Sequence, residues 1–236
     1  MNEQAAPNNE DNTPTQPEPL SPRQRRILGV LVEKARTTPD SYPLSLNGLV
    51  TGCNQKSNRN PLMSLTPEQV EDELFEMREN GLVAEVHGGG RVAKYRHYAY
   101  DYLGVKGVEA AVMTELLLRG EQTAGDLRTR ASRFEPIADL KTLQDILGSL
   151  IAKKLVVALT PPGRGQMFTH NLYSEYELES IKKSVAAGAP ATTRTSSSSG
   201  PSAPANSDEL ESLKSDVAEL KLEVERLKDR LSALES

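Results

Sequence analysis

The sequence predicts an α+β protein, mainly α, with two tandem winged-helix domains and a C-terminal coiled-coil helix. Helical and hairpin patterns follow one another twice in the same order, an offset of 73 residues superposes much of the second set on the first, and a heptad repeat ends the chain. The predicted segments are a disordered tail (1–20), a winged-helix domain (21–104), a second winged-helix domain with a trailing helix (105–186), a flexible linker (187–207) and a parallel coiled coil (208–236).

The first domain begins with a helix over 21–36, because a serine N-cap and a proline precede an apolar helical face. A shorter helix is predicted for 44–52. A third follows a capping box at Thr66 and ends at Asn80-Gly81. Alternating residues on both sides of a glycine-rich turn predict a β-hairpin over 82–100.

The second domain repeats this order. Residues 108–119 form an apolar-faced helix, Thr123 caps a short helix around Leu127, and Asp139 begins a third helix. Residues 155–173 read as a second hairpin around a Pro-Pro-Gly turn.

The repeat keeps its register through the third helix and the hairpin. The first helices match at the larger offset of 85, so the first domain carries a longer loop, placed at 53–65. Two unrelated α+β segments are the alternative to a duplicated unit. The 73-residue offset pairs Val70 with Leu143, Leu74 with Leu147, Met77 with Leu150, Tyr95 with Phe168, His97 with His170 and Tyr100 with Tyr173.

Three stretches of the first domain resemble the bacterial YceH family. They are 21–29 (SPRQRRILG), 41–49 (SYPLSLNGL) and, most specifically, the polar stretch 53–61 (CNQKSNRNP). The resemblance covers roughly residues 20–175. It implies tandem winged helices and adds little about the target.

The last segment has an apolar residue at alternating steps of three and four, which is typical of a coiled coil. Pairing of g with the following e position joins opposite charges at 209/214, 216/221, 223/228 and 230/235, which favours parallel self-association. A dimer is favoured over a trimer, although residues 230–235 resemble a trimer-favouring pattern; docking of this helix on its own domain is the other alternative. The a and d residues are Leu210, Leu213, Val217, Leu220, Val224, Leu227, Leu231 and Leu234.

Composition argues against several classes of protein. Cys53 is the only cysteine, so no intrachain disulfide can form, and no apolar run is long enough for a membrane span. The acidic, proline-containing N-terminus is not a secretory signal, so a cytoplasmic location is expected. Residues 21–175 hold 20 Lys and Arg against 18 Asp and Glu, which predicts only modest nonspecific affinity for phosphates.

The candidate contact surface for duplex DNA is the polar stretch after the second helix, together with cations of the two hairpins. A loop that bonds its own backbone is an equal alternative for the polar stretch, and a solvated strand face is the alternative for the hairpins. The candidate nucleic-acid-binding residues are Asn54, Gln55, Lys56, Ser57, Asn58, Arg59, Arg91, Lys94, Arg96 and Arg164.

The third helix of the first domain argues against its insertion into a DNA groove. It holds six carboxylates against Arg78, so phosphates would repel it, and it could face a protein partner instead. No catalytic or metal site and no cofactor is predicted, because the histidines lack metal-ligand spacing and the usual nucleophile and phosphate-loop motifs are absent. A packing role is expected for His97 and His170, and a buried position for Cys53.

Two functions therefore remain. The leading hypothesis is a DNA-associated, transcription-regulatory protein that is not an enzyme and is oligomerised by its coiled coil, so that avidity offsets weak single-site affinity. The alternative is a protein-interaction scaffold that uses winged helices without direct DNA contact.

Overall fold

The computed structural model describes residues 18–87 and 92–188. The heptad segment, most of the N-terminal tail and Arg91 lie outside these residues. The first half of the described chain contains α1 (Pro22–Thr37), the 3₁₀ turn η1 (Pro39–Ser41), β1 (Leu44–Ser45), α2 (Leu46–Cys53), α3 (Pro67–Glu79), β2 (Val83–Val86), β3 (Lys94–His97) and α4 (Ala99–Leu103). The second half contains α5 (Gly107–Arg119), β4 (Gln122–Thr123), α6 (Ala124–Ala131), α7 (Leu140–Ala152), β5 (Val156–Ala158), β6 (Met167–His170) and α8 (Glu175–Ala186).

The expected α+β, mainly helical class is confirmed. Each half has three principal helices and one three-stranded antiparallel sheet, with strand order β1-β3-β2 in the first and β4-β6-β5 in the second. The register also repeats: Leu44 lies opposite Tyr95 in the first sheet, and Gln122 lies opposite Phe168 in the second. The 73-residue offset relates Tyr95 to Phe168, and both side chains are buried.

Helix starts follow the predicted caps. Ser21 and Gln24 form a capping box at α1, and Thr66 and Gln69 form another at α3. Ser45 caps α2, which therefore begins two residues later than predicted, because Leu44 and Ser45 pair with β3 as a short strand. α4 was also not predicted; it follows β3 directly and ends at Gly104, whose φ of 60° favours glycine.

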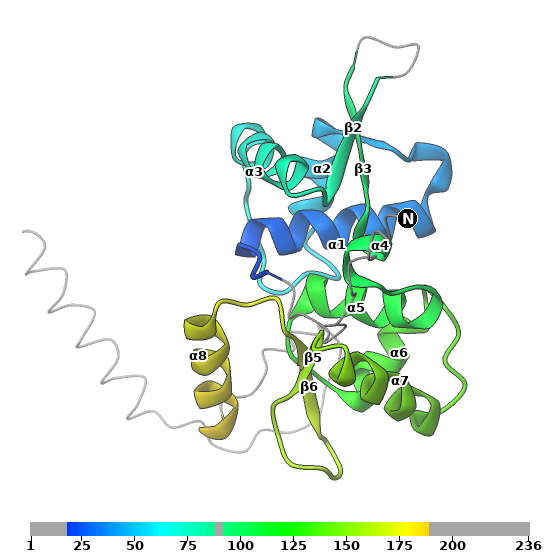
Figure 1. The fold of residues 1–236 in the computed structure, drawn as a ribbon, viewed down its shortest axis with the longest axis vertical. Helices are drawn as coiled ribbons and strands as arrows, with labels where there is room; N and C mark the ends of the chain where they lie inside the picture. Colours follow the sequence, from blue (N-terminus) through cyan, green and yellow to red (C-terminus); the bar gives the residue numbers. More distant parts are fainter. Residues whose placement is uncertain (1–17, 88–91, 189–236) are drawn as a thin grey trace, which may run out of the picture. The chain divides into compact units, whose positions relative to one another are not determined.

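α1 lies at the centre of the described chain, between α2 and α3 on one side and α5 on the other (Figure 1). Ten consecutive residues, Gln24–Glu33, are buried, so the helix has no solvent-exposed face over this stretch. The approach to α5 is close: a Cβ atom on Gly29 would lie 2.9 Å from Leu118 Cδ2. The described residues accordingly fall within one compact unit rather than two.

Contacts between the halves begin before α1. Leu20, which composition placed in the disordered tail, is buried, and its N–H donates to the Leu172 carbonyl at 3.0 Å. Arg25 donates to the same carbonyl and to both oxygens of Glu177, and it stacks over the ring of Tyr173. These partners lie some 150 residues away in sequence, so local composition could not indicate them.

Two histidines at equivalent places in the repeat have the same local role. His97 Nδ1 accepts from the N–H of Ala99 and His170 Nδ1 accepts from the N–H of Leu172, both at 3.2 Å. Each ring also packs on an aromatic neighbour, His97 edge-on to Tyr100 and His170 stacked on Tyr173. The expected packing role is confirmed.

Cys53 is fully buried at the end of α2, as expected. Burial raises the pKa of its thiol to about 12, so the thiolate form is strongly disfavoured. Among the described residues, no helix is long and apolar enough to cross a membrane, and no cluster of three potential metal ligands is present.

Candidate interaction surfaces

The polar stretch lies in the loop between α2 and α3, and much of it is directed into the protein. The Asn54 side chain forms two hydrogen bonds with the backbone of Leu65, donating to its carbonyl at 2.8 Å and accepting from its N–H at 2.7 Å. Asn60 bonds the end of α5, through its backbone to Leu118 and through its side chain to Arg119. These two residues therefore hold the loop closed and join it to the second half.

Arg59 is not a surface cation. Its side chain has no exposed area, and its guanidinium group forms an ion pair with both carboxylate oxygens of Glu33 on α1. It also donates to the carbonyls of Gly52 and Asn58 and to the side chain of Gln55. The expectation that Arg59 contacts phosphate is therefore corrected: its donors are occupied by protein acceptors.

The Arg59–Glu33 pair belongs to a charge network that crosses from α1 to α5. Arg133 Nη2 lies 3.5 Å from Glu33 Oε1 and 3.0 Å from Glu115 Oε2, and Arg119 Nε lies 2.8 Å from Glu115 Oε1. Burial raises the pKa of Glu115 although three arginines act against that shift. The network is a structural link between the halves, and the loop that carries Arg59 is part of it.

Only three members of the polar stretch are exposed: Lys56, Ser57 and Asn58. Asn58 has a φ of 58°, and its side chain accepts a hydrogen bond from Arg119. Lys56 is thus the only exposed cation in this stretch. Of the other residues, Asn54 bonds the loop's own backbone, as the self-bonded alternative expects, whereas Asn60 bonds α5 and Arg59 pairs with Glu33 of α1.

The three hairpin cations within the described residues, Lys94, Arg96 and Arg164, are on the surface. Lys94 and Arg96 are exposed at alternate positions of β3, opposite Val86 and Ala84 of β2. Arg96 also donates to the Tyr98 hydroxyl and lies over its ring. Arg164 is exposed in the other hairpin, at the loop between β5 and β6.

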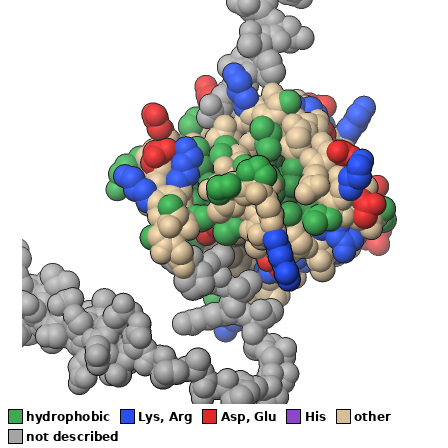
Figure 2. Space-filling model, turned by 90° about the horizontal axis from the view of Figure 1, so that it is seen from below, with side chains coloured by type: hydrophobic (Ala, Val, Ile, Leu, Met, Phe, Trp, Pro, Cys, Tyr) green, Lys and Arg blue, Asp and Glu red, His purple; other side chains and the backbone are tan. Residues whose placement is uncertain are grey.

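No single basic patch is visible on the face shown in Figure 2. Lys and Arg side chains are spread around its edge among Asp and Glu, and hydrophobic side chains occupy its middle.

Exposed apolar residues on α7 include Leu140 and Ile151, which are 44% and 42% exposed. The only α7 cation–carboxylate pair in the described part of the chain joins Lys141 and Asp145.

α3 has an acidic outer surface with an aromatic residue in it. Phe75 is 62% exposed. One helical turn before it lie Glu71 and Asp72, and one turn after it lie Arg78 and Glu79, all of them exposed. Arg78 is paired with Glu85 at 2.7 Å, so the charge left around Phe75 is negative.

Two other α3 carboxylates, those of Glu73 and Glu76, have structural partners. Glu73 accepts from Ser21 at 3.0 Å and Glu76 accepts from Gln24 at 2.9 Å, which attaches α3 to the start of α1. Phe75 was not among the predicted contact residues. Its position outside the buried stripe of Val70, Leu74 and Met77 was the available signal.

The fold and these surfaces define an α+β, mainly helical protein with a repeated helix-and-hairpin unit and two kinds of exposed surface, a basic hairpin and an acidic helix. The chain belongs to the family described as "Protein of unknown function, DUF480", whose model matches residues 20–166. This agrees with the YceH-type resemblance of the polar stretch.

Several curated relatives carry the name UPF0502 protein. The one from Rhodopirellula baltica is 52% identical over 217 residues, 90% of either chain. The relative from Geotalea uraniireducens is 48% identical over 63% of this chain and 69% of its own, and that from an Acidovorax species is 38% identical over 92% and 96%.

Proposed function

We propose that this chain is a tandem winged-helix adaptor that binds a partner protein through α3. The order helix, short strand, helix, helix and hairpin, found in both halves, is the order expected of winged helices. In helix-turn-helix proteins the corresponding helix makes the specific contacts. The exposed surface of α3 is therefore the place where the first domain would meet its target.

The observation that carries the proposal is Phe75 among carboxylates. An exposed aromatic residue at a helix surface supplies apolar contact area, and aromatic residues, Phe among them, are enriched at protein–protein interfaces. Glu71, Asp72 and Glu79 would repel DNA phosphates but attract a basic rim around an apolar pocket on a protein. This favours the scaffold alternative over groove binding by α3.

The test is affinity capture with the full chain, with and without nuclease, from cells that express the protein. A partner that survives nuclease and is lost in Glu71→Lys/Glu79→Lys and in Phe75→Ala is expected, with at least a tenfold fall in recovery. The control is Gln144→Lys/Ala152→Lys, which places lysines at the equivalent positions of α7 and should retain the partner.

DNA association is the second candidate, because Lys94 and Arg96 share the exposed side of β3. In that case the captured material would be lost on nuclease treatment, and Glu71→Lys/Glu79→Lys would not weaken it. That result would contradict the adaptor proposal.

The heptad segment at 208–236 would join two chains as a parallel coiled coil. Its four g/e pairs of opposite charge and its a and d residues support this. Light scattering on the full chain should therefore give about twice the mass of one chain, reduced to a single chain by Leu220→Glu/Leu227→Glu, since each substitution places a carboxylate at a core position. An unchanged mass in this variant would contradict the coiled coil.

A further inference from the structure

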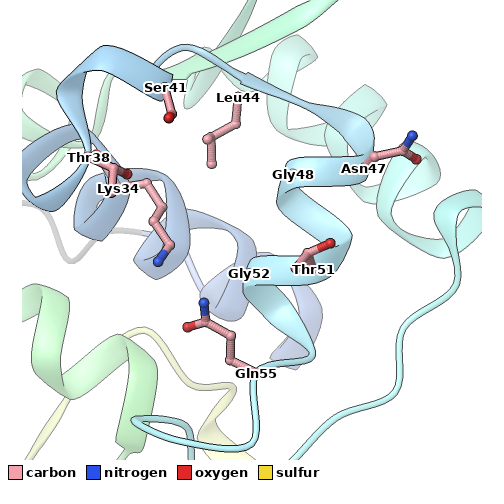
Figure 3. Close-up of a pocket in the computed structure, with 9 residues that line it drawn as sticks. All are labelled: Lys34, Thr38, Ser41, Leu44, Asn47, Gly48, Thr51, Gly52 and Gln55. Carbon is pink, nitrogen blue, oxygen red and sulfur yellow. Dashed lines mark hydrogen bonds between the residues drawn. The ribbon is translucent and has the colours of Figure 1, made fainter.

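An open cavity of about 360 Å³ lies between the C-terminal end of α1 and one side of α2 (Figure 3). This volume lies within the range of small-molecule sites. α1 contributes Lys34, β1 contributes Leu44, α2 contributes Gly48 and Gly52, and Gln55 follows α2. No carboxylate is among the described residues that line it.

Lys34 is unusually well covered for a lysine. Its side chain is only 22% exposed, and among the described residues the one carboxylate within 4.0 Å of its Nζ is that of Glu33, at 3.8 Å. Glu33 already has Arg59 as an ion-pair partner and Arg133 at 3.5 Å. Lys34 therefore shares its one carboxylate partner among the described residues with two arginines, and its amine keeps donor capacity for a further acceptor.

Gln55 supplies a second donor to the cavity. Its Oε1 atom accepts from Arg59 at 2.9 Å, which fixes the orientation of the amide and leaves the Nε2 group to donate elsewhere. Figure 3 shows the Lys34 amine and the Gln55 amide directed toward the same space, whereas the Asn47 side chain points away from it. Two donors, one of them cationic, therefore converge here.

The opposite wall is smooth and partly apolar. Gly48 and Gly52 lie one helical turn apart on α2 and present no side chain, and Leu44 points into the cavity. Substitution of Gly52 by a residue with a side chain would displace α1 or α2, because a Cβ atom there would lie 2.6 Å from Val30 Cγ1. The cavity thus has two hydrogen-bond donors, one of them cationic, on one side and a partly apolar surface on the other.

We propose that this cavity binds a small-molecule oxyanion, a carboxylate or a phosphate, through Lys34 Nζ and Gln55 Nε2. Both donors suit such a group, since a charged amine and an amide N–H form short hydrogen bonds to anionic oxygens. Gln55 also holds Arg59, so the occupied cavity is in direct contact with the charge network between α1 and α5.

The test is an NMR titration of the ¹⁵N-labelled full chain with inorganic phosphate and, separately, with acetate, at constant ionic strength. Saturable shifts are expected for the backbone amides of Gly48 and Gly52 and for the side-chain amide of Gln55. A response to phosphate alone or to acetate alone identifies which oxyanion is preferred. No saturable response to either ion would overturn the proposal.

Two variants locate the binding. Lys34→Met removes the cation but keeps the aliphatic stem, and Gln55→Glu keeps an acceptor for Arg59 but removes the donor; each should weaken binding at least tenfold. Lys141→Met, at an exposed lysine of α7, should bind as the parent does. Undiminished binding in either cavity variant with a folded spectrum would also overturn the proposal.

Discussion

Replacement of Arg59 by methionine is expected to lower the free energy of unfolding by about 3–5 kcal/mol, the usual cost of leaving one member of a buried ion pair alone. Methionine fills much of the same volume, so the loss comes from the ion pair and from the hydrogen bonds that the guanidinium donates to Gly52, Asn58 and Gln55. Of the cations in the described part of the chain, Glu33 would keep Arg133 at 3.5 Å and Lys34 at 3.8 Å, in a site where its own side chain is 6% exposed. Urea denaturation of the full chain followed by circular dichroism measures the change.

The control is Lys56→Met, three residues earlier in the same loop. Lys56 is exposed, so a change within about 0.5 kcal/mol is expected. The double variant Glu33→Gln/Arg59→Met should lose less than the sum of the two single variants, because neither charge is then left unpaired. Equal, small effects of Arg59→Met and Lys56→Met would contradict the buried pair.

This result also changes how DNA binding should be tested. A variant that combines Lys56→Ala with Arg59→Ala would lose stability as well as an exposed cation, so reduced binding would have two explanations. Lys94→Ala/Arg96→Ala removes exposed charge without touching the buried network. It is the cleaner probe of phosphate contact.

Acidification from pH 8 to pH 5 is expected to destabilise the fold through His97 and His170. Burial is the main cause that lowers their pKa values, to about 4 and about 3, from an ordinary value near 6.5. Between these values the unfolded chain binds a proton that the folded chain does not, so stability is full above pH 6.5 and is lost progressively below it. By pH 5 the loss is on the order of 2 kcal/mol for each imidazole.

Neighbouring charges act in both directions on these rings. Arg36 and Arg96 disfavour the charged form of His97 while Asp101 favours it, and Arg25 and Glu177 act likewise on His170. The raised pKa of Glu115 has the opposite effect on stability, because that carboxyl gains stability as the pH falls. The comparison with variants therefore isolates the histidine contribution.

His97→Asn/His170→Asn is the variant to compare. An asparagine Oδ1 can replace Nδ1 as the acceptor for the N–H two residues later, and it does not titrate. The dependence of the urea midpoint on pH between 8 and 5 should be much flatter in this variant. A slope as steep as that of the parent would exclude the imidazoles as its source.

The sequence predicted the regular elements well and the role of the polar stretch poorly. Capping boxes at Ser21 and Thr66 and a 3.6-residue apolar period are local signals, so helix starts could be read directly. A two-residue strand such as β1 has no such signal, because its pairing with β3 is nonlocal.

The prediction that the polar stretch is a contact surface was wrong for Arg59 for a similar reason, because its contacts are also nonlocal. Seven polar residues in a row resemble a solvated contact loop, and nothing local shows that Arg59 meets Glu33 of α1 or that Asn60 meets α5. Phe75 is the converse case. Its exposure follows from helical periodicity alone, because it lies outside the apolar stripe of Val70, Leu74 and Met77.

The position of α1 determines whether either half of the described chain can fold without the other. A helix that is covered on every side by elements of both repeats cannot be shared between two independent folding units. Cleavage of the chain near residue 105, followed by separation of the two parts, would remove α5 from α1 and expose the apolar surface of α1 that α5 now covers. The duplicated repeats are therefore expected to melt cooperatively, in one transition, and neither should persist as an autonomous fragment.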